Sequence, residues 1–171
     1  MPEFLLVRVS VWLACVAWFI GALCRLSPPR LKNDSTVSSH SLTKSEATFA
    51  WSWFVGAALL SIHIMASYAF VYHWNHHAAL AATAEDSFRV TGVRASWGVY
   101  VNFAFAAIWL CYSLACLTGK RRRGWFDSAI YLFLACIVAC ATILFEVGAV
   151  RWTATIAAFI LLALHVRAGK I

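Results

Sequence analysis

The stretch FAWSWFVGAALLSIHIMASYAFVYH, from Phe49 to His73, decides the structural class of this protein. It contains no Asp, Glu, Lys or Arg, and nearly all of its residues are apolar. A helix needs roughly 20 such residues to cross the hydrocarbon core of a bilayer. The stretch therefore predicts a membrane-spanning helix over residues 49–73.

Similar segments occur on both sides of this helix. Spans are predicted over residues 4–24, 97–117 and 127–145, and a shorter apolar segment covers residues 152–166. As a helix, the short segment rises only ~23 Å, so it either crosses a thinned bilayer or packs as a re-entrant hairpin. We expect a single all-α domain over residues 1–171, an integral membrane helix bundle with four to five transmembrane helices.

The composition supports this class. Hydrophobic residues make up 63% of the 171 residues and charged residues only 12%, whereas a soluble domain is about half apolar and a quarter charged. This excludes a water-soluble enzyme, a disordered regulator and a nucleic-acid binder. The expected partners are the lipid bilayer and either other membrane protein subunits or further copies of the chain.

The basic residues predict the orientation, because cytoplasmic loops of membrane proteins collect Lys and Arg. Four basic residues in succession, 120–123, follow the third span. With that loop in the cytoplasm, the C-terminus lies inside, the N-terminus lies outside, and ten of the 14 Lys and Arg residues face the cytoplasm. We therefore predict a multi-pass protein of the cell inner (plasma) membrane.

The aromatic and small residues predict how the helices meet lipid and each other. Most of the nine tryptophans, Trp51 and Trp53 among them, fall at predicted span boundaries, where Trp serves as an interfacial anchor. Gly56 and Gly98 lie among alanines, a composition suited to close helix packing.

A histidine cluster follows the second span in the sequence HWNHH, residues 73–77. On a continuous helix, His77 would lie about 40° from His73 on one side and His76 about 60° from it on the other, so all three could converge on one point beside the helix. Neutral imidazole binds zinc, copper and iron. The H-x-x-H-H spacing also resembles one histidine box of membrane fatty-acid desaturases, but six histidines in the whole chain are too few for such a di-iron site.

Other polar residues are predicted at the same depth as the histidines. A helix on the outer surface is expected over residues 76–91, and it ends at Thr91-Gly92. The predicted metal ligands are His73, His76, His77, Asp86 and Glu146, supported by Asn102 and Tyr100. The alternative is a set of ordinary interfacial residues with no metal, in which Glu146 pairs with Arg151.

His63 lies near the middle of the second span, where an ionisable side chain is costly and often functional. Three roles are open for it. It can be the axial ligand of a tetrapyrrole cofactor, a step in a proton path, or one partner in a hydrogen bond between helices.

Residues 63–110 resemble a group of small, uncharacterised bacterial polytopic membrane proteins. The resemblance lies in His73-Trp74-Asn75-His76, in Thr91-Gly92, and in the segment from Gly98 to Phe103 followed by Trp109. The group has an H-x-W-S-H-like stretch, a T-G turn and a G-x-Y-x-N-Y segment, so this chain departs from it at Asn75 and Phe103. The resemblance implies a membrane protein but no activity.

Two functional hypotheses follow from the sequence. The first is a histidine-lined site for a metal or a metal-bearing cofactor at the outer face, with no reaction assigned. The second is a small accessory subunit of a larger membrane complex that has no chemistry of its own.

Overall fold

The computed structural model describes residues 2–26, 44–119, 124–144 and 148–168, and within these ranges it contains no β-strand. Its helices are α1 (Pro2–Leu26), α2 (Lys44–Ala66), α3 (His76–Thr91), α4 (Gly98–Leu117), α5 (Trp125–Ala139) and α6 (Ala149–Ala168). Two π-helical turns, η1 (Ser67–Val71) and η2 (Cys140–Leu144), continue α2 and α5. The predicted all-α helix bundle is confirmed.

Four helical segments are long and apolar enough to cross a membrane. They are Leu5–Arg25, Lys44–Val71, Gly98–Leu117 and Trp125–Ile143, close to the four long spans that the sequence predicts. In α6, the apolar part found among the described residues is shorter, Arg151–Leu161. A membrane crossing by α6 stays a prediction.

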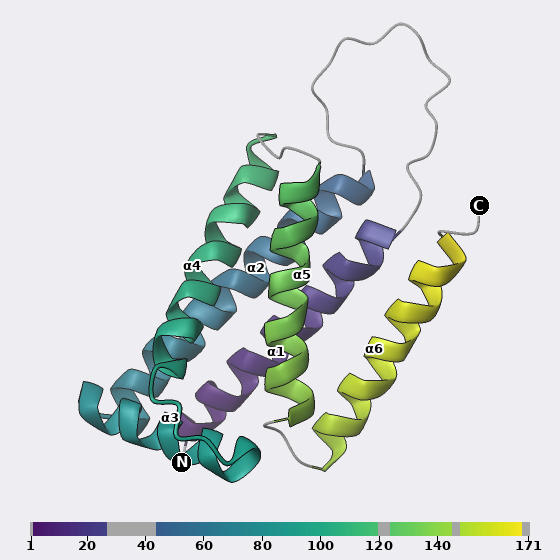
Figure 1. Cartoon of the computed structure of the whole chain (residues 1–171). Helices are drawn as coiled ribbons and strands as arrows, with labels where there is room; N and C mark the ends of the chain where they lie inside the picture. The colour runs from purple at the N-terminus through teal and green to yellow at the C-terminus, as the bar shows by residue number, and fades with distance from the viewer. Residues whose placement is uncertain (1, 27–43, 120–123, 145–147, 169–171) are drawn as a thin grey trace, which may run out of the picture.

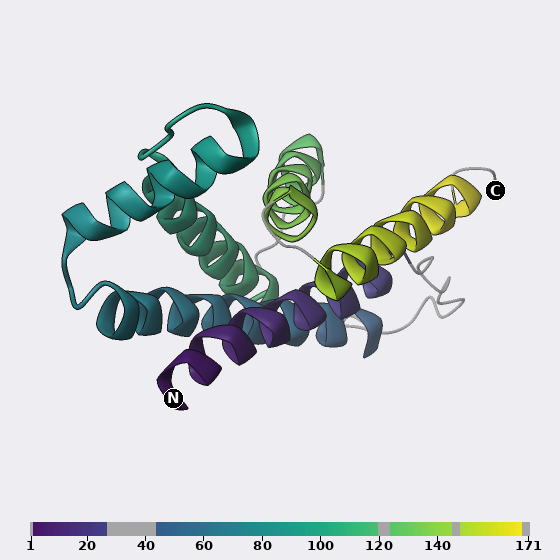
Figure 2. The ribbon, with the colours of Figure 1, turned by 90° about the horizontal axis from the view of Figure 1, so that it is seen from below.

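The helices form an open bundle with one helix across its end. In Figure 1, α1 and α2 run side by side in opposite directions, and α4 packs against α2. The view from below in Figure 2 shows α6 beside α1 and α5 on the same side of the hairpin as α4. Helix α3 lies across the end of the bundle where the N-terminus is found (Figure 1). The polar residues of α3 therefore lie outside the apolar spans.

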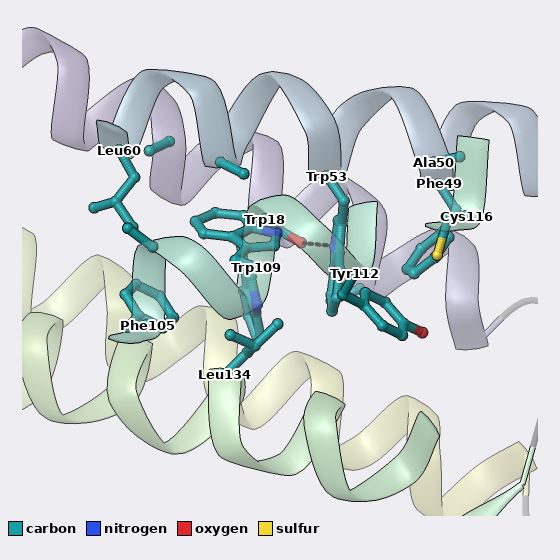
Figure 3. Close-up of a cluster of buried hydrophobic side chains, with 14 residues drawn as sticks. Trp18, Phe49, Ala50, Trp53, Leu60, Phe105, Trp109, Tyr112, Cys116 and Leu134 are labelled. Atoms are coloured by element: carbon teal, nitrogen blue, oxygen red, sulfur yellow. Dashed lines mark hydrogen bonds between the residues drawn. The ribbon is translucent and has the colours of Figure 1, made fainter. Parts of the chain in front are cut away.

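The bundle core is built around Trp53 on α2, which is fully buried. Its indole stacks on the ring of Tyr131 at 5.8 Å and meets the ring of Tyr112 at 5.5 Å between centroids. Its Nε1–H donates to the carbonyl of Trp18 at 3.3 Å (Figure 3). The prediction that Trp53 anchors the interface is wrong, because its side of α2 faces α1, α4 and α5. Trp51 is 58% exposed, as an interfacial anchor requires.

Two glycines permit this close packing. A Cβ at Gly21 on α1 would lie 2.0 Å from Trp53 Cδ1, and a Cβ at Gly56 would lie 2.7 Å from Trp109 Cζ2. Neither distance leaves room for a carbon atom. The predicted close packing at Gly56 is confirmed, and Gly21 is a second such position.

A buried ion pair joins three helices near the end opposite α3. Arg25 Nη2 of α1 lies 2.8 Å from Asp127 Oδ2 of α5, and the Tyr112 hydroxyl of α4 donates to Asp127 Oδ1. The Arg25 guanidinium also lies over the ring of Tyr131, 4.6 Å from its centroid. Because burying a charge costs free energy unless it is paired and hydrogen-bonded, these contacts are what make Asp127 tolerable in the core.

Candidate histidine site at the α3 end

The chain leaves the second span through a tight turn. The π-helical turn η1 ends at Val71, and His73 and Trp74 then adopt left-handed backbone angles with φ of 47° and 60°. Backbone bonds from Trp74 N to Tyr68 O and from Asn75 N to Tyr72 O, each 2.8 Å, close the turn. Left-handed angles are uncommon for residues other than glycine, and at this turn they redirect the chain from the span into α3.

Helix α3 begins and ends with capping residues. The Asn75 side chain accepts a hydrogen bond from Ala78 N at 3.1 Å, which satisfies one of the free N–H groups of the first turn. Gly92 ends the helix with φ of 76°, a conformation that glycine adopts without strain. The structure therefore contains the predicted helix over residues 76–91, whereas its location on the outer membrane surface stays a prediction.

The turn changes the geometry assumed for the histidine cluster. His73 lies in the turn and is exposed, whereas His76 and His77 are the first two residues of α3. Consecutive residues of a helix point about 100° apart. The expectation that all three imidazoles share one helical face is wrong, because residues 72–75 are not helical.

His76 is held between two tyrosines from two other elements. Its Nδ1 lies 3.0 Å from the hydroxyl of Tyr68 in η1, and its Nε2 lies 3.1 Å from the hydroxyl of Tyr100 in α4. A neutral imidazole has one N–H and one acceptor nitrogen. It therefore donates to one hydroxyl and accepts from the other, and the ring is fixed from both sides.

Aromatic packing supports this arrangement. The ring of Tyr68 stacks on His76 at 6.3 Å between centroids and packs on Phe103 at 5.6 Å. The Tyr100 ring meets His76 at 5.7 Å. The sequence predicts Tyr100 at the depth of the histidines but does not predict Tyr68 there. Its position eight residues before His76 gave no sign of contact, because contact depends on the turn.

Tyr72 follows η1 directly and lies just outside the second span. Burial, and then the negative charge of Asp86, raise the pKa of the Tyr72 hydroxyl above its usual value of 10.0. This phenol is therefore protonated at neutral pH and available as a hydrogen-bond donor.

The predicted carboxylate ligands lie elsewhere. Asp86 is ten residues along α3 from His76, about 15 Å of helix, and its Oδ1 lies 3.0 Å from Arg89 Nη2 in an exposed ion pair. Glu85 pairs with Arg94 at 3.1 Å. Glu146, the other predicted ligand, lies outside the described residues.

Asn102 has no hydrogen-bond partner among the described residues. It lies one turn inside the end of α4, is exposed, and makes no hydrogen bond with any residue that the structure describes. The predicted hydrogen bond from Asn102 to a neighbouring helix or a histidine is not formed within the described residues.

His63 has one of the three roles predicted for it, a hydrogen bond between helices. Its Nδ1 lies 2.8 Å from the carbonyl oxygen of Val7, which makes a hydrogen bond between α2 and α1. Since a carbonyl only accepts, Nδ1 carries the proton and Nε2 has the lone pair. This tautomer is the one that leaves Nε2 able to bind a metal.

Across the described residues, no group of three or more His, Cys, Asp and Glu side chains is placed to hold a metal ion. What the structure brings together is one histidine and two tyrosines. No protein-family model, curated protein or solved structure is significantly similar to this chain.

Proposed function

We propose that this chain is a multi-pass protein of the inner (plasma) membrane that holds a transition metal ion at its α3 end, with His76 as the central ligand. Copper, zinc and iron all suit an imidazole ligand. The observation that carries the proposal is the position of His76 between the hydroxyls of Tyr68 and Tyr100.

A metal ion on one of these ring nitrogens would replace the hydrogen bond there, and the tyrosine hydroxyl would have to move off the line of the nitrogen lone pair to become a second ligand. With metal–ligand bonds of about 2.0–2.1 Å, two neighbouring ligand atoms of one ion lie roughly 3 Å apart. The N···O distances at His76 are 3.0 and 3.1 Å. The two ring nitrogens face opposite ways, so one ion uses either the Tyr68 side or the Tyr100 side.

Further ligands are required, because one histidine and one phenolate do not hold an ion tightly. His73 and His77 are both exposed and close in sequence to His76, and water can fill the remaining positions. Glu146 is retained as a proposed ligand from the sequence. A phenolate ligand favours iron or copper over zinc, and its charge-transfer absorption would give the protein a visible colour.

The test is elemental analysis with an absorption spectrum on the detergent-purified protein. We expect a near-stoichiometric metal ion in the wild type, its loss in the His73→Ala/His76→Ala double variant, and its retention in His63→Ala. The His63→Ala variant is the matched control, because it removes an imidazole of the same chain from a different site. A metal-free wild type that folds normally contradicts the proposal.

The same samples test the tetrapyrrole proposal for His63. A Soret band that His63→Ala abolishes and His73→Ala/His76→Ala leaves intact would assign the cofactor to His63 Nε2. Loss of the band in the double variant alone would assign it to the α3 end.

The proposed orientation places α3 on the outer side and the C-terminus in the cytoplasm. Arg25 and Lys44 lie at the opposite end of the bundle from α3, in agreement with the positive-inside rule. In a cysteine-free background, Ala81→Cys on α3 should react with an impermeant thiol reagent added outside intact cells. Arg122→Cys should react only after the membrane is opened, and the opposite pattern would reverse the orientation.

The lack of a partner for the Asn102 amide supports a second candidate function, that of an accessory subunit of a membrane complex. An unpaired amide one turn inside a span gains hydrogen bonds if it meets another polypeptide there. In mild detergent, blue-native electrophoresis of native membranes should then show the chain in a larger assembly that Asn102→Leu weakens. The same migration for wild type and Asn102→Leu, at the size of the free chain, would exclude this role.

A further inference from the structure

An open groove of ≈480 Å³ runs along the α1–α2 hairpin. Ala17 and Ile20 of α1 form one wall, and Ala47, Trp51 and Val55 of α2 form most of the other. The groove lies within two of the four segments that are long and apolar enough to cross a membrane. It therefore opens toward the surrounding lipid.

The lining is apolar in its chemistry, although two hydroxyl residues contribute to it. The Thr48 hydroxyl donates to the carbonyl of Lys44 at 2.9 Å, and the Ser52 hydroxyl donates to the carbonyl of Phe49 at 3.1 Å. Both hydroxyls are thus satisfied within α2. What the groove offers an occupant is hydrocarbon and the exposed face of the Trp51 indole.

The groove covers most of the depth of one leaflet of a bilayer. Its lining residues on α2 run from Ala47 to Val55, eight residues or about 12 Å, and Lys44 lies three residues before them. Half of the ~30 Å hydrocarbon core is about 15 Å. A phospholipid acyl chain that enters from the Lys44 end is therefore the occupant whose shape and polarity fit.

The charge at the groove end favours an anionic headgroup. Lys44 is exposed, and on the helix it lies within about 40° of Thr48, Trp51 and Val55. Glu46 is two residues further on and projects from the other side of α2. A basic residue just outside a span attracts the anionic headgroups of the membrane surface.

We propose that this groove binds one anionic phospholipid, with an acyl chain along Trp51 and Val55 and its phosphate at Lys44. The proposal depends on the membrane location of α1 and α2 and not on the metal site. A failed metal proposal would therefore leave the lipid proposal intact, and the reverse also holds.

Fluorescence quenching by brominated lipids tests it. The full chain is reconstituted into phosphatidylcholine–phosphatidylglycerol vesicles of fixed headgroup composition, with bromine on the chains of either one lipid or the other. The Trp51 signal is the difference between the wild type and Trp51→Phe. Per mole of brominated lipid, we expect Trp51 to be quenched several-fold more by brominated phosphatidylglycerol than by brominated phosphatidylcholine.

Three variants make the outcome decisive. Lys44→Gln should remove the excess quenching, whereas Arg8→Gln, an equal charge loss on an exposed residue at the other end of α1, should preserve it. Ala47→Leu, which fills the groove, should lower quenching of Trp51 by both lipids. Trp12, 53% exposed on α1, serves as the control indole through Trp12→Phe.

Two results would overturn the proposal. Equal quenching of Trp51 by the two lipids would show that the groove contacts only bulk lipid. Quenching of Trp12 without quenching of Trp51 would show that protein, such as a second copy of the chain, covers the groove. Unchanged circular dichroism in every variant excludes misfolding as the cause.

Discussion

Trp53 and His76 are both rings that contact two tyrosines, yet their surroundings differ. Trp53 is 0% exposed, and it is fixed by packing against Tyr112, Tyr131 and the backbone of α1. His76 is only partly buried, and two hydrogen bonds to tyrosine hydroxyls fix it. The same kind of ring contact is therefore part of a closed core at Trp53 and part of a partly exposed, hydrogen-bonded group at His76.

This difference has an energetic basis. Around Trp53, helices approach so closely that Gly21 and Gly56 leave no room for a side chain. Any change of side-chain volume there should therefore lower the stability. Around His76, ring contacts and two hydrogen bonds meet at a partly exposed position, where water can replace a lost hydrogen bond at small cost. The core should tolerate substitution poorly and the α3 end should tolerate it well.

The largest effect is expected from Trp53→Ala. It leaves a cavity at the centre of the bundle and should lower the free energy of unfolding by about 3–5 kcal/mol. Unfolding by SDS in mixed micelles, followed by circular dichroism, measures the change. Trp51→Ala, two residues away and exposed, is the matched control and should cost much less. Equal losses in the two variants would contradict the assignment of Trp53 to the core.

A smaller loss is expected when the buried ion pair is broken. Asp127→Ala leaves the Arg25 charge without its partner and should cost roughly 3 kcal/mol. The double variant Arg25→Met/Asp127→Leu removes both charges and should recover much of this loss, because neither charge then has to be desolvated. The same SDS titration measures both, and a double variant no better than Asp127→Ala would refute this account.

At the α3 end, the strongest single effect should come from the helix cap. Asn75→Ala removes the acceptor for Ala78 N and should cost about 1 kcal/mol. Because α3 contacts the bundle mainly through α4, the loss should be local. Hydrogen exchange should accelerate at the amides of the first turn of α3 and stay unchanged in α2. Acceleration throughout the bundle would mean that α3 and the core unfold together.

The smallest effect is expected from Tyr100→Phe. It removes one hydrogen bond to His76 at an exposed position, so the stability loss should be below ~1 kcal/mol. Metal content should nevertheless fall if the ion uses the Tyr100 side, whereas Tyr68→Phe should lower it if the ion uses the other side. A stability loss as large as that of Trp53→Ala would contradict the expectation that the α3 end tolerates substitution better than the core.

The surroundings of His76 could be predicted only in part from the sequence. The helix over residues 76–91 was predictable, because residues 78–82 are mostly alanine and Gly92 ends it. The partnership of His76 with Tyr68 was not, because it depends on the left-handed angles of His73 and Trp74. A continuous helix through residues 73–77 would have moved every imidazole.

The sequence by itself determined that this is an all-α chain with four long apolar helices, and where those helices lie. A span must satisfy its backbone hydrogen bonds within itself, so its signal is local and can be read from about 20 residues. Only the tertiary structure decided that Trp53 is core while Trp51 is exposed, that Arg25 meets Asp127, and that Tyr68 holds His76. These contacts depend on which helix faces which and on one turn, and nearly uniform apolarity around each helix leaves no pattern that specifies them.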